Sequence, residues 1–239
     1  MEQQKKKRAG LVIALVACLA LVGVAGVMAW YSSTSEITNN FVDGGITDPG
    51  TDPTNPDKPL KPEVAPDPEH NGHQGQVNGN IVENQWIEGS KVTPGSSIPK
   101  NPNVGIGKNS DSCYVFVNVK NNFTSGAHFP LNKGWKAVEA TQYKGQANEY
   151  AGGLFVYVGK DVPVNTGNAA ILEANPAADS WTGEVFSKVK FDADADLGAN
   201  KTIKVSAYLV AASHKTEKID VDEITDAAKA WANKINTQQ

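Results

Sequence analysis

Apolar and polar residues alternate along several short stretches of the chain. In the stretch Cys113–Val119, the residues Val115, Val117 and Val119 share one face of an extended segment. The stretch Ile203–Val210 also places an apolar residue at every second position. Together with four further apolar stretches, they predict six strands: Ile81–Ile87, Cys113–Val119, Trp135–Ala140, Leu154–Val158, Val185–Phe191 and Ile203–Val210.

Turn-forming residues separate these predicted strands. Examples are Pro94-Gly95, Gly152-Gly153 and Thr166-Gly167-Asn168. Short strands joined by such turns, with no helix between them, are typical of an antiparallel sandwich or barrel. The sequence therefore predicts an all-β, antiparallel β-sandwich domain over residues 80–239.

A different period appears near the C-terminal end. Asp220 with Glu223 resembles a capping box in which Asp replaces the usual Ser or Thr. Lys234 lies near the end of the segment, where a cation complements the helix dipole. The apolar residues follow a helical repeat: Ile224, Ala227, Ala228, Trp231 and Ile235. These features predict one amphipathic helix whose Trp231 face packs on the sandwich.

The N-terminal segment has the pattern of an export signal. Four basic residues, Lys5 to Arg8, precede the uncharged apolar run Ala9–Trp30. The run exceeds the ~7–15 residues of an ordinary signal core and nearly reaches the ~20 that span a bilayer. A long cleaved signal and an uncleaved anchor are thus both open. We predict cleavage between Ala29 and Trp30, because Val27-Met28-Ala29 suits a signal peptidase. Either way, the remaining chain lies outside the cytoplasm.

Charge and cysteine content change once residues 1–29 are set aside. That segment holds four of the 22 basic residues and one of the 26 acidic residues, so the remainder has 18 bases, 25 acids and a net charge of -7. This acidity argues against a nucleic-acid partner. Cys18 lies within the signal, which leaves Cys113 without a partner for an internal disulfide. We interpret Cys113 as a buried residue of a strand.

Two segments separate the signal peptide, residues 1–29, from the sandwich. Residues 30–45 combine scattered apolar residues with Ser, Thr and Asn and end at Gly44-Gly45, which predicts a short β segment. Residues 46–79 are rich in Pro and Asp. Such a composition buries too little apolar surface to offset the entropy of ordering, so we predict a disordered linker.

Three stretches of the chain carry a resemblance to a known family. They are Gly23–Thr34 with Ile37–Phe41, then Glu83–Trp86 with Thr93–Gly95 and Ile98–Val104, and finally Gly153–Phe155 with Ile203–Val210. Together these stretches resemble the TasA/camelysin family of exported Gram-positive proteins. The first stretch, the signal junction, is similar to those processed by the SipW-type, ER-like signal peptidase, and the other two match the family in order along the body of the chain.

The resemblance implies a jelly-roll β-sandwich that is secreted and resides on the cell surface or in a biofilm matrix. The best-known members polymerise into matrix fibres, in which the mature N-terminal strand of one subunit completes the sheet of the next. The partner would then be the protein itself, as a homopolymer, or a related matrix protein. The signal peptidase would act during export, and the membrane would be met only through the signal segment. The linker 46–79 departs from the family pattern and bears on the mode of assembly.

Strand donation also has a physical basis of its own. A sandwich that lacks one strand exposes unpaired N–H and C=O groups, and a tethered strand from a neighbour can pair with them. Head-to-tail donation does not close, so it propagates as a filament. Two other interpretations stay open, namely pairing within the same subunit and a disordered tail. The candidate donor residues are Trp30, Tyr31, Ile37, Phe41 and Val42.

The sequence offers little catalytic chemistry. Some camelysin relatives are described as metallo-endopeptidases, but a zincin needs an H-E-x-x-H helix. The four histidines occur outside such a motif: His70, His73, His128 and His214. We therefore predict a protein that is not an enzyme, with no catalytic residue, cofactor or metal site. A camelysin-like metallo-endopeptidase is kept as the second alternative function.

Two other groups of residues suggest binding functions. Asp192, Asp194 and Asp196 resemble the start of a calcium loop, although Leu197 and Ile203 replace its Gly and bidentate Glu. A solvated strand edge is the preferred interpretation, and weak calcium binding stays open. The tryptophans Trp86, Trp135 and Trp181 could stack on sugars, which supports a carbohydrate-binding or adhesion module as the first alternative. Core packing is the preferred use of each tryptophan.

Overall fold

The computed structural model describes most of the sandwich domain and parts of the segment before it. The described residues are 32–40, 42–43, 51–52, 55–59, 79–83, 85, 91–107, 111–197, 201–214, 217–218 and 220–237. They form strands, nearly all paired antiparallel, and one C-terminal helix. The predicted antiparallel β-sandwich with a C-terminal helix is therefore confirmed.

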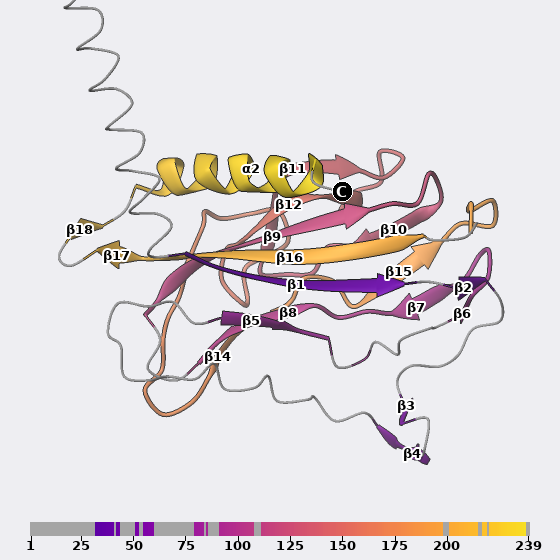
Figure 1. Ribbon diagram of the computed structural model, residues 1–239, viewed down its shortest axis with the longest axis horizontal. Coiled ribbons are helices and arrows are strands. Elements are labelled where there is room, and N and C mark those ends of the chain that lie inside the picture. Colours follow the sequence, from indigo (N-terminus) through magenta and orange to yellow (C-terminus); the bar gives the residue numbers. More distant parts are fainter. Residues whose placement is uncertain are drawn as a thin grey trace, which may run out of the picture.

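A large sheet of nine strands forms the middle of the molecule (Figure 1). Its order is β1-β16-β9-β12-β10-β15-β7, with β11 beside β12 and β13 beside β9. The strands are β1 (Ser32–Asn40), β7 (Ser97–Pro99), β9 (Cys113–Asn121), β10 (Ala127–Pro130), β11 (Trp135–Gln142), β12 (Glu149–Tyr157), β13 (Ile171–Leu172), β15 (Lys188–Phe191) and β16 (Thr202–Ala211).

Smaller elements surround the large sheet. A second sheet has the order β14-β8-β5, with β5 at Gly79–Val82, β8 at Asn103–Ile106 and β14 at Ser180–Glu184. The remaining strands pair two by two: β2 (Val42–Asp43) with β6 (Lys91–Val92), β3 (Thr51–Asp52) with β4 (Asn55–Pro59), and β17 (Ser213–His214) with β18 (Glu217–Lys218). Helix α2 spans Val221–Thr237. In Figure 1, α2 lies on one side of the large sheet and the β14-β8-β5 sheet lies on the other.

Both faces of the central strands are buried, which explains their strongly apolar sequences. One face of β9, including Val115 and Val117, packs in the core between the two sheets. The opposite face, including Tyr114 and Phe116, packs in a second core beneath α2. Because successive residues of a strand point to opposite faces, a strand covered on both sides needs apolar residues at nearly every position.

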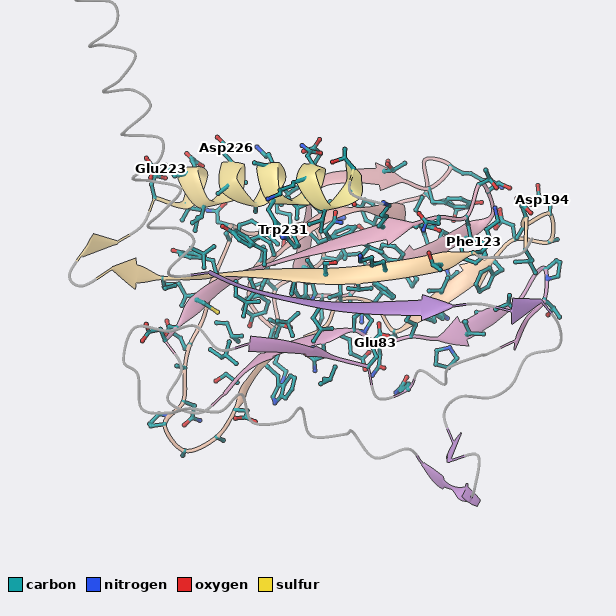
Figure 2. All side chains as sticks on the ribbon, viewed as in Figure 1. Glu83, Phe123, Asp194, Glu223, Asp226 and Trp231 are labelled. Atoms are coloured by element: carbon teal, nitrogen blue, oxygen red, sulfur yellow. The ribbon has the colours of Figure 1, made fainter. Side chains whose placement is uncertain are left out.

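Helix α2 matches the predicted amphipathic helix. The side chain of Asp220 accepts a hydrogen bond from the N–H of Asp222, with an N···O distance of 2.8 Å, which caps the first turn. Ile224, Ala228 and Ala232 are buried against the sheet. Trp231 stacks on Tyr208 of β16, with ring centroids 5.2 Å apart. Figure 2 shows Trp231 on the sheet side of the helix, with Glu223 and Asp226 on the opposite side.

Truncating the buried helix contact should measurably weaken the fold. Ile224 is fully buried, so Ile224→Ala is expected to lower the free energy of unfolding by about 2–4 kcal/mol through lost burial and a residual cavity. Asn233 is exposed on the same helix, and Asn233→Ala is the matched control with almost no expected effect. Denaturant unfolding of both variants tests this. Equal stability of the two variants would mean that α2 does not pack on the sheet in solution.

Three of the six predicted strands have wrong limits. The sequence predicts Leu154–Val158, whereas β12 spans Glu149–Tyr157, and the other two are shorter than predicted. Ile81–Ile87 was expected as one strand, but β5 ends at Val82, and Glu83 instead turns to bond Lys100 of the other sheet. Val185–Phe191 was also expected as one strand, but β15 begins at Lys188. Val185 and Phe186 are fully buried without belonging to a strand. Buried positions favour apolar residues whether or not they lie in a strand. Val185 and Phe186 therefore gave the sequence the pattern of a longer strand.

Candidate assembly site at the edge of the large sheet

Strand β1 forms one edge of the large sheet. It pairs antiparallel with β16 over its whole length, from Ser32 opposite Val210 to Asn40 opposite Thr202. The other edge of β16 pairs with β9 over a similar length. In Figure 1, β1 runs along β16 on the side that faces β5 of the smaller sheet. β1 thus closes the sandwich at the seam between its two sheets.

The strand that receives β1 belongs to the core. Ile203, Val205, Ala207 and Leu209 of β16 are fully buried. An edge strand with such side chains would present a long row of unpaired backbone groups beside an apolar surface if β1 were absent. The β16 edge therefore has the properties of an acceptor site for an extended strand.

The predicted donor residues have different outcomes. Ile37 stands opposite Val205 in the β1–β16 ladder. Val42 lies in β2, which pairs in parallel with β6 and leaves the large sheet. Trp30, Tyr31 and Phe41 lie outside the described residues, as does the predicted cleavage residue Ala29. In this single chain, β1 pairs with β16 of the same chain.

A long connection separates β1 from the rest of the domain. β2 ends at Asp43 and β5 begins at Gly79, so about 35 residues lie between them. Within this connection, β3 and β4 pair with each other. Fully extended, 35 residues span on the order of 100 Å. Once the β2–β6 pairing is released, this contour length is large enough for β1 to reach the β16 edge of a neighbouring copy.

Two of the three aspartates that resemble a calcium loop, Asp192 and Asp196, have lysine partners in the structure, and Asp194 is exposed. Asp192 Oδ2 lies 2.5 Å from Lys144 Nζ, and Asp196 Oδ2 lies 3.1 Å from Lys201 Nζ. The hydrogen bond from Lys144 lowers the pKa of Asp192, and one from Tyr143 adds to this effect. Within the described part of the chain, no group of three or more His, Cys, Asp or Glu side chains is placed to hold a metal ion. Asp192 and Asp196 therefore serve as ion-pair partners.

The cysteine, tryptophan and histidine candidates that the structure describes lie at separate places in the fold. Cys113 is fully buried in β9, and burial raises the pKa of its thiol, so it acts as a core residue. Trp135 is fully buried and unavailable to a sugar. Trp181 is partly exposed, and its indole ring lies against Gly105. His128 is buried, and His214 belongs to β17. Three candidates lie outside the described residues: Trp86, His70 and His73.

A buried ion pair, which the sequence pattern did not predict, joins the two sheets. Lys100 follows β7 and is fully buried, and its Nζ lies 2.6 and 2.8 Å from the two carboxylate oxygens of Glu83. Burial lowers the pKa of Lys100, and the charge of Glu83 opposes this change. Alternation along β7 carried a signal for this burial, since Lys100 lies two residues after the buried Ile98.

A shallow polar groove lies beneath the C-terminal end of α2. Its volume is about 440 Å³, and Asn118, Lys120 and Asn236 are among its lining residues. Asn118 Nδ2 donates to Asn236 Oδ1 at 2.9 Å, and Lys120 Nζ donates to the carbonyl of Asn236 at 2.8 Å. These groups bond one another and tie the helix end to the sheet.

No helix among the described residues has the length and apolar character needed to cross a bilayer. Comparison of the chain with protein-family models, with curated proteins and with solved structures found no match.

Proposed function

We propose that this chain is an exported structural protein of a Gram-positive cell surface or biofilm matrix, and that it assembles into fibres by strand exchange. In this assembly, β1 of one copy pairs with β16 of the next. The observation that carries the proposal is the placement of β1. It is an edge strand, it pairs over nine positions with a core strand, and 38 residues, 41–78, link it to β5. The resemblance of the signal junction and body to the TasA/camelysin family supports the same function.

Under this proposal, β1 can pair with β16 of its own chain or with β16 of a neighbouring chain, and these two arrangements compete. The β16 edge accepts β1 in the same register whichever copy supplies it, because the backbone groups are identical. Because β1 and β16 are linked within one chain, β1 stays at an effective concentration on the order of millimolar near its own β16 edge. Exchange is therefore favoured when many copies are crowded together, or when a fibre end presents an unfilled edge.

A pair of cysteines across the ladder distinguishes the two arrangements. Thr38 stands opposite Lys204, and directly opposite Cβ atoms are within about 5.5 Å, close enough for a disulfide after small adjustments. In a chain that starts at Trp30, the double variant Thr38→Cys/Lys204→Cys is expected to form a ladder of covalent multimers when oxidised at high protein concentration. Non-reducing gels and negative-stain electron microscopy measure the outcome. Cys113 is buried and should stay unreactive.

The matched control moves one cysteine out of register. Ser32 stands opposite Val210, about 20 Å along the strand from Lys204, so Ser32→Cys/Lys204→Cys should form neither product. Cross-linked monomers at every concentration, without fibres, would contradict the proposal. Intramolecular pairing would then be established, and a carbohydrate-binding or adhesion module would become the leading function.

A further inference from the structure

A buried histidine lies where several elements of the large sheet meet. His128 belongs to β10 and is only 5% exposed. Its ring stacks face to face on Tyr143, which lies in the turn between β11 and β12, with ring centroids 4.1 Å apart and planes within 4°. This stacking packs the imidazole of β10 against the β11–β12 turn.

Two carboxylates face the two nitrogens of this ring. His128 Nε2 lies 3.5 Å from Glu149 Oε2, and His128 Nδ1 lies 3.8 Å from Asp192 Oδ1. Both distances exceed those of ordinary N–H···O hydrogen bonds. Among the residues that the structure describes, the buried atoms His128 Nδ1 and Glu149 Oε2 have no hydrogen-bond partner. Buried polar atoms of this kind are rare and call for an explanation.

Each of these carboxylates already has a lysine partner. Lys190 of β15 bonds Glu149, and Lys144 bonds Asp192, which also accepts a hydrogen bond from the Tyr143 hydroxyl at 2.5 Å. The four charges balance without any contribution from His128. A protonated His128 would therefore place a third cation beside two carboxylates that are already neutralised.

The charge balance favours a neutral imidazole at pH 7. Burial lowers the pKa of His128, and the positive charge of Lys190 lowers it further. The charges of Glu149 and Asp192 and the carbonyl of Gly126 raise the pKa, but burial is the largest influence. Protonation in acid therefore places a positive charge on a ring whose buried surroundings disfavour that charge.

The same residues connect the elements at this end of the sheet. Glu149 begins β12, Lys190 lies in β15, and Asp192 follows β15. Backbone hydrogen bonds run alongside, from the Asp192 N–H to the Gly126 carbonyl at 2.9 Å and from the Tyr143 N–H to the Glu149 carbonyl at 2.8 Å. A change in charge at His128 would therefore act on β10, β12, β15 and the β11–β12 turn together.

We propose that His128, with Tyr143, Lys144, Glu149, Lys190 and Asp192, forms an acid-sensitive latch. At neutral pH the uncharged ring packs between the sheet and the turn and holds them together. In acid the protonated ring carries a surplus buried charge, and the turn separates from β10 and β15. This inference concerns the stability of one end of the domain and does not depend on the proposed assembly.

The sign of the pH dependence follows from proton linkage. In the unfolded chain, His128 titrates near its ordinary pKa of about 6.5. In the folded chain its pKa is lower, so unfolding takes up a proton between the two values. Stability should be fully present above about pH 7 and decrease as the pH falls through this window. The unfolding equilibrium constant should rise by up to about tenfold per pH unit there.

The experiment uses the chain from Trp30, which holds every residue that the structure describes. His128→Phe keeps the stacking on Tyr143 but removes the titration, so it should lose most of the pH dependence between pH 7 and 5. Denaturant unfolding at each pH measures this effect. Hydrogen exchange of the Asp192 and Tyr143 amides should accelerate in acid in the unmodified chain and stay nearly constant in His128→Phe.

NMR titration of the imidazole tests the charge network directly. His128→Phe identifies the resonance of His128 by its loss, and the other histidines serve as internal references. Lys190→Met should raise the pKa of His128, because it removes a repelling cation and frees Glu149. Lys144→Met, at an exposed lysine, should act in the same direction through Asp192. A His128 pKa at or above the ordinary value in the unmodified chain would overturn the proposal, as would an unchanged pH dependence in His128→Phe.

Discussion

Deletion of residues 30–45 is expected to destabilise the sandwich by several kcal/mol, and a synthetic peptide of the same residues should restore it. β1 and β16 face each other at nine positions. In an antiparallel ladder, such a length corresponds to about nine hydrogen bonds, each with a net value of about 0.5–1.5 kcal/mol. The deletion would also expose the backbone edge of the core strand β16 to solvent. Because small domains are stable by only about 5–15 kcal/mol, this loss is large.

Denaturant unfolding with and without the peptide measures this effect. The midpoint should rise with peptide concentration, and a scrambled peptide serves as the control. A peptide with Ile37→Asp should bind more weakly, because position 37 stands opposite the fully buried Val205. If the shortened chain were as stable as the longer one and bound no peptide, β1 would have no structural role at this edge. Strand exchange would then lose its physical basis.

The second large effect is expected at the buried ion pair. Lys100→Ala leaves the carboxylate of Glu83, whose side chain is 2% exposed, without its cation. Breaking a buried pair in this way typically costs about 3–5 kcal/mol, mostly from the uncompensated charge. Replacing both partners by Met removes the charge together with its need for a partner. The double variant Glu83→Met/Lys100→Met should therefore recover most of the stability that Lys100→Ala loses.

A double-mutant cycle with denaturant unfolding measures the coupling between Glu83 and Lys100. The matched control is the exposed pair Lys229–Asp226 on α2, whose Nζ–Oδ1 distance is 2.9 Å. Lys229→Ala should change stability by less than about 0.5 kcal/mol, because solvent screens an exposed pair. A Lys100→Ala effect no larger than that of Lys229→Ala would show that the pair is solvated in solution and does not join the sheets.

Local periodicity accounts for the elements that sequence analysis placed well. β9 and β16 were recognised because apolar residues recur along them at the spacing of a strand, and the structure buries those residues. Helix α2 was recognised from its helical repeat and from the Asp220 cap, which the hydrogen bond to Asp222 confirms. Both signals come from residues a few positions apart, so neighbouring sequence is sufficient to reveal them.

Short strands were harder to recognise. β7, β8 and β10 have only three or four residues each, too few for a period to stand out. Their positions depend on the strands that accept them, as when β15 pairs with β7 on one side and β10 on the other. A strand of this length is stabilised by its partners more than by its own propensity.

Local residue patterns were sufficient to establish the class of fold, the long strands and the amphipathic helix. They also showed that a strand-like segment and a Pro/Asp-rich connection precede the sandwich. Three contacts became visible in the folded chain alone: β1 lies on β16, Lys100 meets Glu83 across 17 positions, and His128 lies between Glu149 and Asp192. The physical reason is that side-chain period is a local property, whereas edge pairing and buried charge pairs depend on which distant segments the folded chain brings together.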